Sequence, residues 1–167
     1  ARQLITTGVL SWTTGEVVEG YSNLLWVLRA SLELQAGLDP DRMSKLWSLG
    51  CGMGVLWLFH RQLPNNLQGN LLLFLIALWP SLDRWSWLGM ESMLYCLLLC
   101  IGWLRLIQGY KQQALFLLFL AAQTRLEGNL HLLVAMGLVG RSSLPILMVT
   151  VLFHLLRTRW YDAFWPT

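Results

Sequence analysis

Six charge-poor apolar runs constrain this chain more than any other feature of its sequence. They cover residues 44–59, 67–80, 88–104, 112–123, 128–139 and 143–156. The apolar residues come in blocks and do not alternate with polar ones, which argues against a β-barrel. Of all residues, 56% are hydrophobic and only 13% are charged, against about 25% charged residues in a soluble domain. The sequence therefore predicts an all-α fold, a polytopic transmembrane helical bundle.

The lengths of the runs limit how they can cross a bilayer. Several are shorter than the ~20 residues that a full span requires. We expect such helices to borrow flanking polar residues, to tilt, or to pack inside a larger bundle. The small-residue strip GCGMG at 50–54 suits close helix packing. Residues 44–156 would then hold about six membrane helices, some of them short.

The segment before these runs, residues 1–43, is expected to lie outside the bilayer as an external loop with an interfacial helix. Residues 24–36 follow the 3.6-residue period of an amphipathic helix, with Arg29 and Glu33 on one face. A charged stripe of this kind favours a helix that lies in the membrane interface. An Asp-Pro-Asp segment should then break this helix, and Pro40 or the following Asp starts the next one.

The polar connections divide between two sides of the membrane if residues 24–36 lie flat. One side receives Arg61, the Arg105–Lys111 loop and Arg141. The other receives the N-terminal loop, residues 81–91, residues 125–127 and residues 157–167, the start of the next external loop. The second side holds more Arg and Lys, against the positive-inside rule if that side is external. We nevertheless expect this arrangement, because it gathers the unusual polar groups together.

The charge and the cysteines of the chain argue against a nucleic-acid-binding protein and against a cysteine metal site. The net charge of +3 is small and the basic residues are dispersed, so nucleic acid is not an expected partner. Cys51, Cys96 and Cys100 lie inside apolar runs, are not spaced as a metal site, and are expected as buried small apolar groups. The chain has no Walker A, HExxH, GxSxG or dinucleotide-binding fingerprint.

Acidic residues at two places are candidates for a site. Glu16 and Glu19, at i and i+3, are interpreted as acid, base or cation contacts, against the alternative of a solvated loop. Glu91 enters the strongest apolar run, where a carboxylate is costly unless it is paired or lies in a wet cavity. For Glu91, function and structural pairing remain equally open.

Arg125 and Glu127 interrupt what would otherwise be a long apolar stretch. One interpretation is a tight hairpin turn held by Gly128. The other is a cation at membrane depth that faces a cavity and binds a phosphate in bidentate fashion. The second interpretation is only slightly favoured on physical grounds.

Histidines and tryptophans are expected mainly in structural roles. His131 and His154 lie on apolar runs and are more often hydrogen-bonded packing residues than ligands, and His60 stands at the end of a run. Trp79, Trp85 and Trp87 cluster in one predicted loop, which should lie at headgroup level.

Five motifs in order carry a resemblance to a known family. They are GEVVEGYSNLLW at 15–26, GLDPDR at 37–42, GMESML at 89–94, TRLEG at 124–128 and a degraded RWYDAFWPT at 159–167. With these residues the chain resembles the GT-C superfamily of integral-membrane glycosyltransferases, in particular the bacterial arabinofuranosyltransferase and mannosyltransferase branch. Leu24 and Leu126 stand where the family patterns GExVEGYSNPLW and TRPEG have Pro.

The resemblance implies a membrane glycosyltransferase that uses a polyprenyl-phosphate-linked sugar on the external membrane face of a bacterial inner or plasma membrane. The acceptor would be a cell-envelope glycan, a lipid or a protein. The resemblance also implies an inverting transfer with an Asp base, expected just upstream of Ala1. The chain would then be an internal piece, with N- and C-terminal parts of the same protein missing.

Candidate roles follow from this implied reaction. Arg2 and Arg125 would hold the charge of the phosphate leaving group, Glu16 and Glu19 would position hydroxyls, and Glu91 would orient an arginine. The full set of predicted substrate-binding residues is Arg2, Glu16, Glu19, Tyr21, Asn23, Glu91, Arg125, Glu127 and Tyr161. No cofactor and no metal-ligand set are expected, with the lipid-phosphate sugar as substrate, and the sequence leaves open whether a divalent cation assists. The alternative is a non-catalytic membrane subunit or an inactive remnant of such an enzyme.

Overall fold

The structure, a computed structural model, describes residues 24–161, and of the side chains after Leu156 it describes that of Arg159 alone. The described residues form helices joined by short connections: α2 (Leu24–Gln35), α3 (Pro40–Gln62), α4 (Leu67–Ala77), α5 (Pro80–Leu88), α6 (Ser92–Ile107), α7 (Lys111–Thr124), α8 (Gly128–Val139), the 3₁₀ helix η1 (Gly140–Ser143) and α9 (Leu144–Tyr161). The all-α class is confirmed. The larger part of each of the six apolar runs lies on one of the helices α3, α4 and α6–α9.

Local capping explains several helix boundaries. Asp39 is the N-cap of α3 and accepts a hydrogen bond from the Asp41 backbone N–H, while Pro40 occupies the first turn. The expected helix start at Pro40 is therefore confirmed. Asn66 caps α4 in the same way, accepting from the Gly69 N–H at 2.8 Å.

The predicted loop at residues 81–91 is wrong in its first part, because residues 80–88 form the helix α5. Pro80 stands in the first turn, where its fixed φ suits a helix, and Asp83 adds a favourable negative charge there. Gly89 ends α5 with φ of +68°, a conformation that glycine adopts readily. The tryptophans expected in a loop therefore lie on α5 or at its start. Helix α9 likewise continues into the predicted loop after residue 157, as far as Tyr161.

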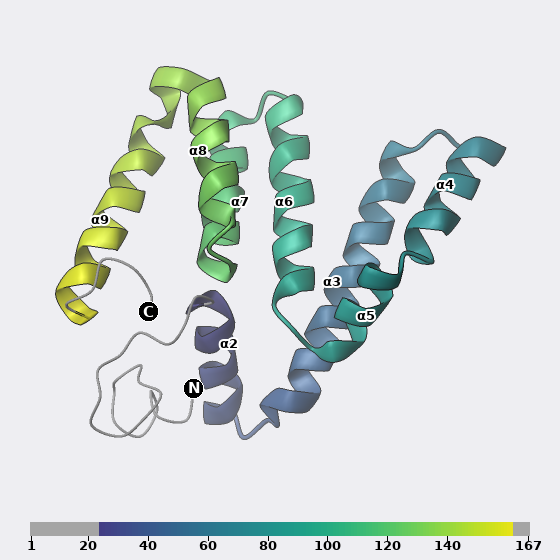
Figure 1. Cartoon of the computed structure of the whole chain (residues 1–167), viewed down its shortest axis with the longest axis horizontal. Helices are drawn as coiled ribbons and strands as arrows, with labels where there is room; N and C mark the ends of the chain where they lie inside the picture. The colour runs from purple at the N-terminus through teal and green to yellow at the C-terminus, as the bar shows by residue number, and fades with distance from the viewer. Residues whose placement is uncertain (1–23, 162–167) are drawn as a thin grey trace.

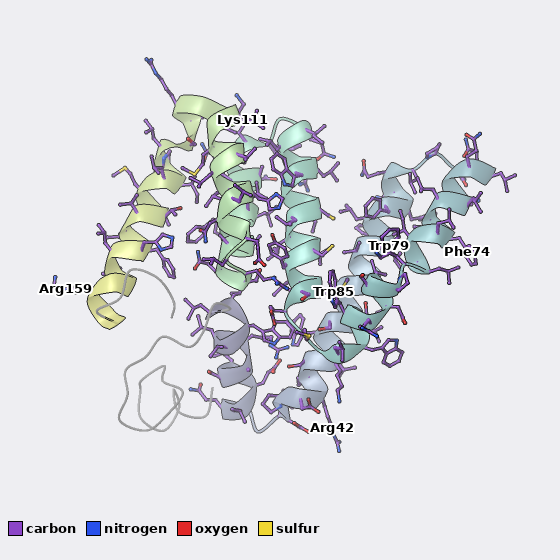
Figure 2. All side chains as sticks on the ribbon, in the orientation of Figure 1. Arg42, Phe74, Trp79, Trp85, Lys111 and Arg159 are labelled. Carbon is purple, nitrogen blue, oxygen red and sulfur yellow. The ribbon has the colours of Figure 1, made fainter. Side chains whose placement is uncertain are left out.

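The helices α6 to α9 alternate in direction (Figure 1). The α6–α7 turn and η1 lie at one end of these helices, and the connection into α6 and the α7–α8 turn lie at their other end. Figure 2 places Lys111 and Arg42 toward opposite ends, with Trp79 and Trp85 between them. Helix α2 lies beyond the second end, next to α3 and α7.

Two small apolar cores hold the helices together. One joins α7, α8 and the start of α9 around Leu115, Leu118 and Leu132, and the other joins α3 and α6 around Val55 and Met93. The GCGMG strip lies at the second core, as expected. A Cβ on Gly52 would overlap the Ser86 side chain of α5, and one on Gly54 would press on Leu97 of α6.

Many large apolar side chains outside these cores are exposed. On α4, Leu67 is 84% exposed and Phe74 is 59% exposed, and on α9 Met148 is 72% exposed. Helix α4 carries no charged residue, and its polar residues Gln68 and Asn70 lie in its first four positions, so the rest of its exposed surface is apolar. Such a surface suits lipid better than water.

The described residues contain one helical stretch, Gly128–Leu156, that is long and apolar enough to cross a membrane. The pair α4 and α5, bent by 50° at its break, would be a second if the two count as one broken span. Only 28% of the apolar 18-residue window in the first stretch is buried, unlike the core helix of a soluble protein. The structure therefore supports membrane association, and the predicted number of spans stays a prediction.

Candidate functional site

The α7–α8 turn places a charged cluster where two helices begin. Thr124 ends α7, Arg125 is extended, and the chain re-enters a helix at Gly128. The Gly128 N–H donates to the Arg125 carbonyl at 3.0 Å. A Cβ on Gly128 would lie 2.6 Å from the backbone of Ala122, so the tightness of this turn depends on glycine. The hairpin interpretation of the sequence describes this geometry.

The Arg125 guanidinium has three kinds of partner. Its Nη2 and Nε donate to the two carboxylate oxygens of Glu127 at 3.1 and 3.4 Å. Its Nη1 donates to Ser92 Oγ at the start of α6, at 3.0 Å. Its Cζ lies 5.9 Å from the centre of the Tyr95 ring. Arg125 therefore links the first turn of α6 to the α7–α8 turn.

Glu91 completes this cluster from the N-terminus of α6. Its side chain is half-buried, and it accepts no hydrogen bond from any residue that the structure describes. A cavity of about 440 Å³ is lined by Glu91, Arg125, Leu126 and Glu127. The structure thus brings together three of the predicted site residues, Glu91, Arg125 and Glu127. Glu91 and Arg125 are more than 30 residues apart in the sequence. We call this cavity the Arg125 pocket.

In the Arg125 pocket, Arg125 and Glu127 stabilise each other's charged forms. The hydrogen bonds that Arg125 donates to Glu127 raise the pKa of the guanidinium, and attraction by Glu91 adds to this effect. The same hydrogen bonds lower the pKa of the Glu127 carboxyl. Both carboxylates stand just before a helix, where the partial positive charge of the helix N-terminus favours anions. The pocket therefore combines two acidic side chains with one guanidinium, a set that can hydrogen-bond hydroxyls and charged groups.

Ser92 and Tyr95 contact Arg125 beside this pocket, although the sequence did not single out either as a partner of Arg125. The available signal was helical spacing, since Glu91 and Tyr95 are four residues apart at the start of α6 and share a face. Ser92 and Arg125 are 33 residues apart in the sequence, so no local sequence pattern predicts their contact.

The other predicted site residues are not placed. Arg2, Glu16, Glu19, Tyr21 and Asn23 lie outside the described residues. Tyr161 ends α9, and its side chain also lies outside what the structure describes. Their predicted roles stay predictions.

A second arginine–glutamate cluster joins α2 to α3. Arg29 and Glu33 form an ion pair of 3.4 Å with side chains only 15% and 9% exposed. Arg29 also donates to Ser44 Oγ at 2.6 Å, and Trp47 Nε1 donates to Glu33 at 2.8 Å. Burial lowers the pKa of Arg29, with Glu33 acting in the opposite direction.

The position of this cluster changes the interpretation of α2. The amphipathic helix exists as predicted, but its charged stripe packs against protein instead of facing headgroups. Leu32 on another face is 67% exposed. Within the described residues, Arg29 Nε and Nη1 and Glu33 Oε2 are buried without a hydrogen-bond partner. A carboxylate–guanidinium pair buried in this way is structural and costly to break.

The remaining candidates keep ordinary environments. His131 accepts a hydrogen bond from Trp103 Nε1 at 3.3 Å, the packing contact expected of a histidine on an apolar run. Cys51 is buried as expected, whereas Cys96 and Cys100 are only half-buried. Among residues 24–161, His, Cys, Asp and Glu side chains form no group of three that could hold a metal ion.

Comparisons of this chain with protein-family models, with curated proteins and with solved structures found no match. The function of the chain is therefore argued from its own residues and from the motif resemblance described above.

Proposed function

We propose that this chain is part of a polytopic bacterial membrane glycosyltransferase that transfers a sugar from a polyprenyl-phosphate donor on the external face of the inner or plasma membrane. The acceptor is a cell-envelope glycan, a lipid or a protein. The general base is the Asp expected upstream of Ala1, so that the reaction needs the full-length protein.

The convergence of Glu91, Arg125 and Glu127 on one pocket is the observation that carries this proposal. The pocket is lined by residues at the start of α6 and in the α7–α8 turn, where a lipid-linked substrate can present its phosphate and sugar while its polyprenyl chain stays among exposed leucines. Arg125 stabilises negative charge that develops on the phosphate as the glycosyl bond breaks. The two carboxylates accept hydrogen bonds from sugar hydroxyls.

One feature favours the alternative of a non-catalytic subunit or inactive remnant. Arg125 already donates hydrogen bonds to Glu127 and Ser92, so its described partners alone account for a role in closing the turn. For transfer, the phosphate must displace at least one of these partners or bind on an open face of the guanidinium.

Transfer by the full-length protein tests the proposal. The protein is reconstituted in liposomes and offered a panel of polyprenyl-phosphate pentoses and hexoses, with Arg125→Ala beside the wild type. Loss of one electrostatic contact in the transition state predicts a fall in kcat of about 100- to 1,000-fold.

Arg105→Ala is the matched control. Arg105 stands at the opposite end of α6, and its Cζ lies 5.3 Å from the Tyr110 ring, a contact similar to that of Arg125 with Tyr95. The control variant should keep full activity. Transfer that is equal in both variants, or absent from the wild type with every donor, would overturn the proposal.

A further inference from the structure

Two polar atoms near the Arg125 pocket have no described partner. The Tyr95 hydroxyl and His131 Nε2 make no hydrogen bond with any group that the structure describes, although both side chains are half-buried. Both stand one helical turn beyond a carboxylate of the pocket, Tyr95 after Glu91 on α6 and His131 after Glu127 on α8. The site therefore has a carboxylate layer at the helix ends and an aromatic layer one turn deeper.

Ring contacts connect the two layers. The Arg125 guanidinium lies 5.9 Å from the Tyr95 ring centre, and the Tyr95 and His131 ring centres are 6.5 Å apart in an edge-to-face arrangement. Trp103 stands behind His131, with ring centres 6.1 Å apart. The aromatic layer therefore lies between α6 and α8, beside the Arg125 guanidinium that lines the pocket.

The hydrogen bond from Trp103 decides which proton His131 carries. Trp103 Nε1 can only donate, so His131 Nδ1 must accept at their 3.3 Å contact. In the neutral ring the proton then lies on Nε2. His131 thus presents a fixed N–H donor that is not used by any described residue. An N–H donor that stands on an apolar helix and is used by none of the described residues points to a ligand.

We propose that His131 binds the sugar of the lipid-linked donor, its Nε2–H donating a hydrogen bond to a sugar hydroxyl while Tyr95 packs against the ring. This assignment rests on the proposed function and adds a specific residue to it. Trp103 acts through His131 as a positioning residue, because its N–H holds the imidazole in one tautomer and one orientation.

A measurement of ligand binding tests the role of His131 independently of sugar transfer. The purified full-length protein is titrated by native mass spectrometry with two probes, a polyprenyl phosphate and the same lipid carrying a hexose. His131→Phe keeps an aromatic ring but removes the donor. We expect about a tenfold loss of affinity for the sugar-bearing probe and an unchanged affinity for the sugar-free probe.

Two further variants control for packing. His131→Gln restores an N–H donor near the position of Nε2 and should recover most of the affinity, and Trp103→Phe should reproduce part of the loss. His60→Phe, at an exposed position on α3, should behave as the wild type.

The outcomes separate the two proposals. Equal binding of the sugar-bearing probe by wild type and His131→Phe overturns the His131 assignment, even if the protein transfers sugar. A sugar-specific loss in His131→Phe supports the assignment, even if no transfer is detected with any acceptor.

Discussion

Two arginine–glutamate pairs in this chain contain the same chemical groups in opposite surroundings. Arg29 and Glu33 are buried between α2 and α3, whereas the Glu127 side chain that pairs with Arg125 is 61% exposed and borders a cavity. Burial makes the first pair expensive to disturb, while water screens the second. The comparison separates a pair that joins helices from a pair that remains available to a ligand.

Removal of one buried partner should have the largest effect. Glu33→Ala leaves the Arg29 guanidinium buried without its counter-charge, which should lower the free energy of unfolding by about 3–5 kcal/mol. Glu127→Ala should lower it by less than about 1 kcal/mol. Chemical unfolding of the full-length protein in detergent measures both. Equal losses would show that the two pairs do not differ as the structure implies.

Exchange of charges in the exposed pair sharpens the contrast between stability and function. In the double variant Arg125→Glu with Glu127→Arg the ion pair can re-form, so we expect stability within about 1 kcal/mol of wild type. Sugar transfer should still fall about 100-fold or more, because the positive charge no longer lies beside Ser92. Transfer assays and unfolding of the same preparation give both values. Retained activity would mean that the position of the cation is unimportant.

The hydrogen bond from Trp47 tests how much the buried pair depends on its neighbours. Trp47→Phe removes the donor to Glu33 Oε1 and should cost about 1.5 kcal/mol, since that acceptor is charged. Trp57→Phe is the control, because Trp57 is 61% exposed on the same helix. A loss of similar size in both variants would attribute the effect to general packing.

The pH dependence of the exposed pair should be the smallest effect. Arg125 lowers the pKa of Glu127 below its ordinary value of 4.5, so the pair stabilises the protein above that value and loses its effect as pH falls through the lowered pKa. The difference in unfolding midpoint between wild type and Glu127→Gln should stay constant from neutral pH to about pH 5 and shrink below 4.5. A difference that shrinks between pH 6 and pH 8 would contradict this assignment.

Much of the helical architecture could be predicted from the sequence. The run at 128–139 has the same bounds as α8, and the run at 112–123 differs from α7 by one residue at each end. These boundaries depend on neighbours in the chain, such as the Asp39 cap and the Gly128 turn. The error at 81–91 arose because the tryptophans there were interpreted as interfacial anchors, although Pro80 and Asp83 are favourable in the first turn of a helix.

Alternation of helix direction also made part of the pocket predictable. Residues 81–91 and 125–127 are expected on one side of the membrane, and the connection into α6 and the α7–α8 turn lie at the same end of the α6–α8 helices. The contact of Arg125 with Ser92 was not predictable, because it depends on the rotation of α6 and α8 about their axes as they pack on α7.

The sequence by itself determined the helical class and most helix ends, because capping, proline and glycine act over a few residues and apolar blocks fold as helices wherever they lie. Only the tertiary structure decided which charged pair is buried. The 3.6-residue period placed Arg29 and Glu33 on one face of α2, but it is the packing of α3 against that face, with Ser44 and Trp47 as partners, that removed the pair from water. Burial depends on segments that meet only after the chain has folded.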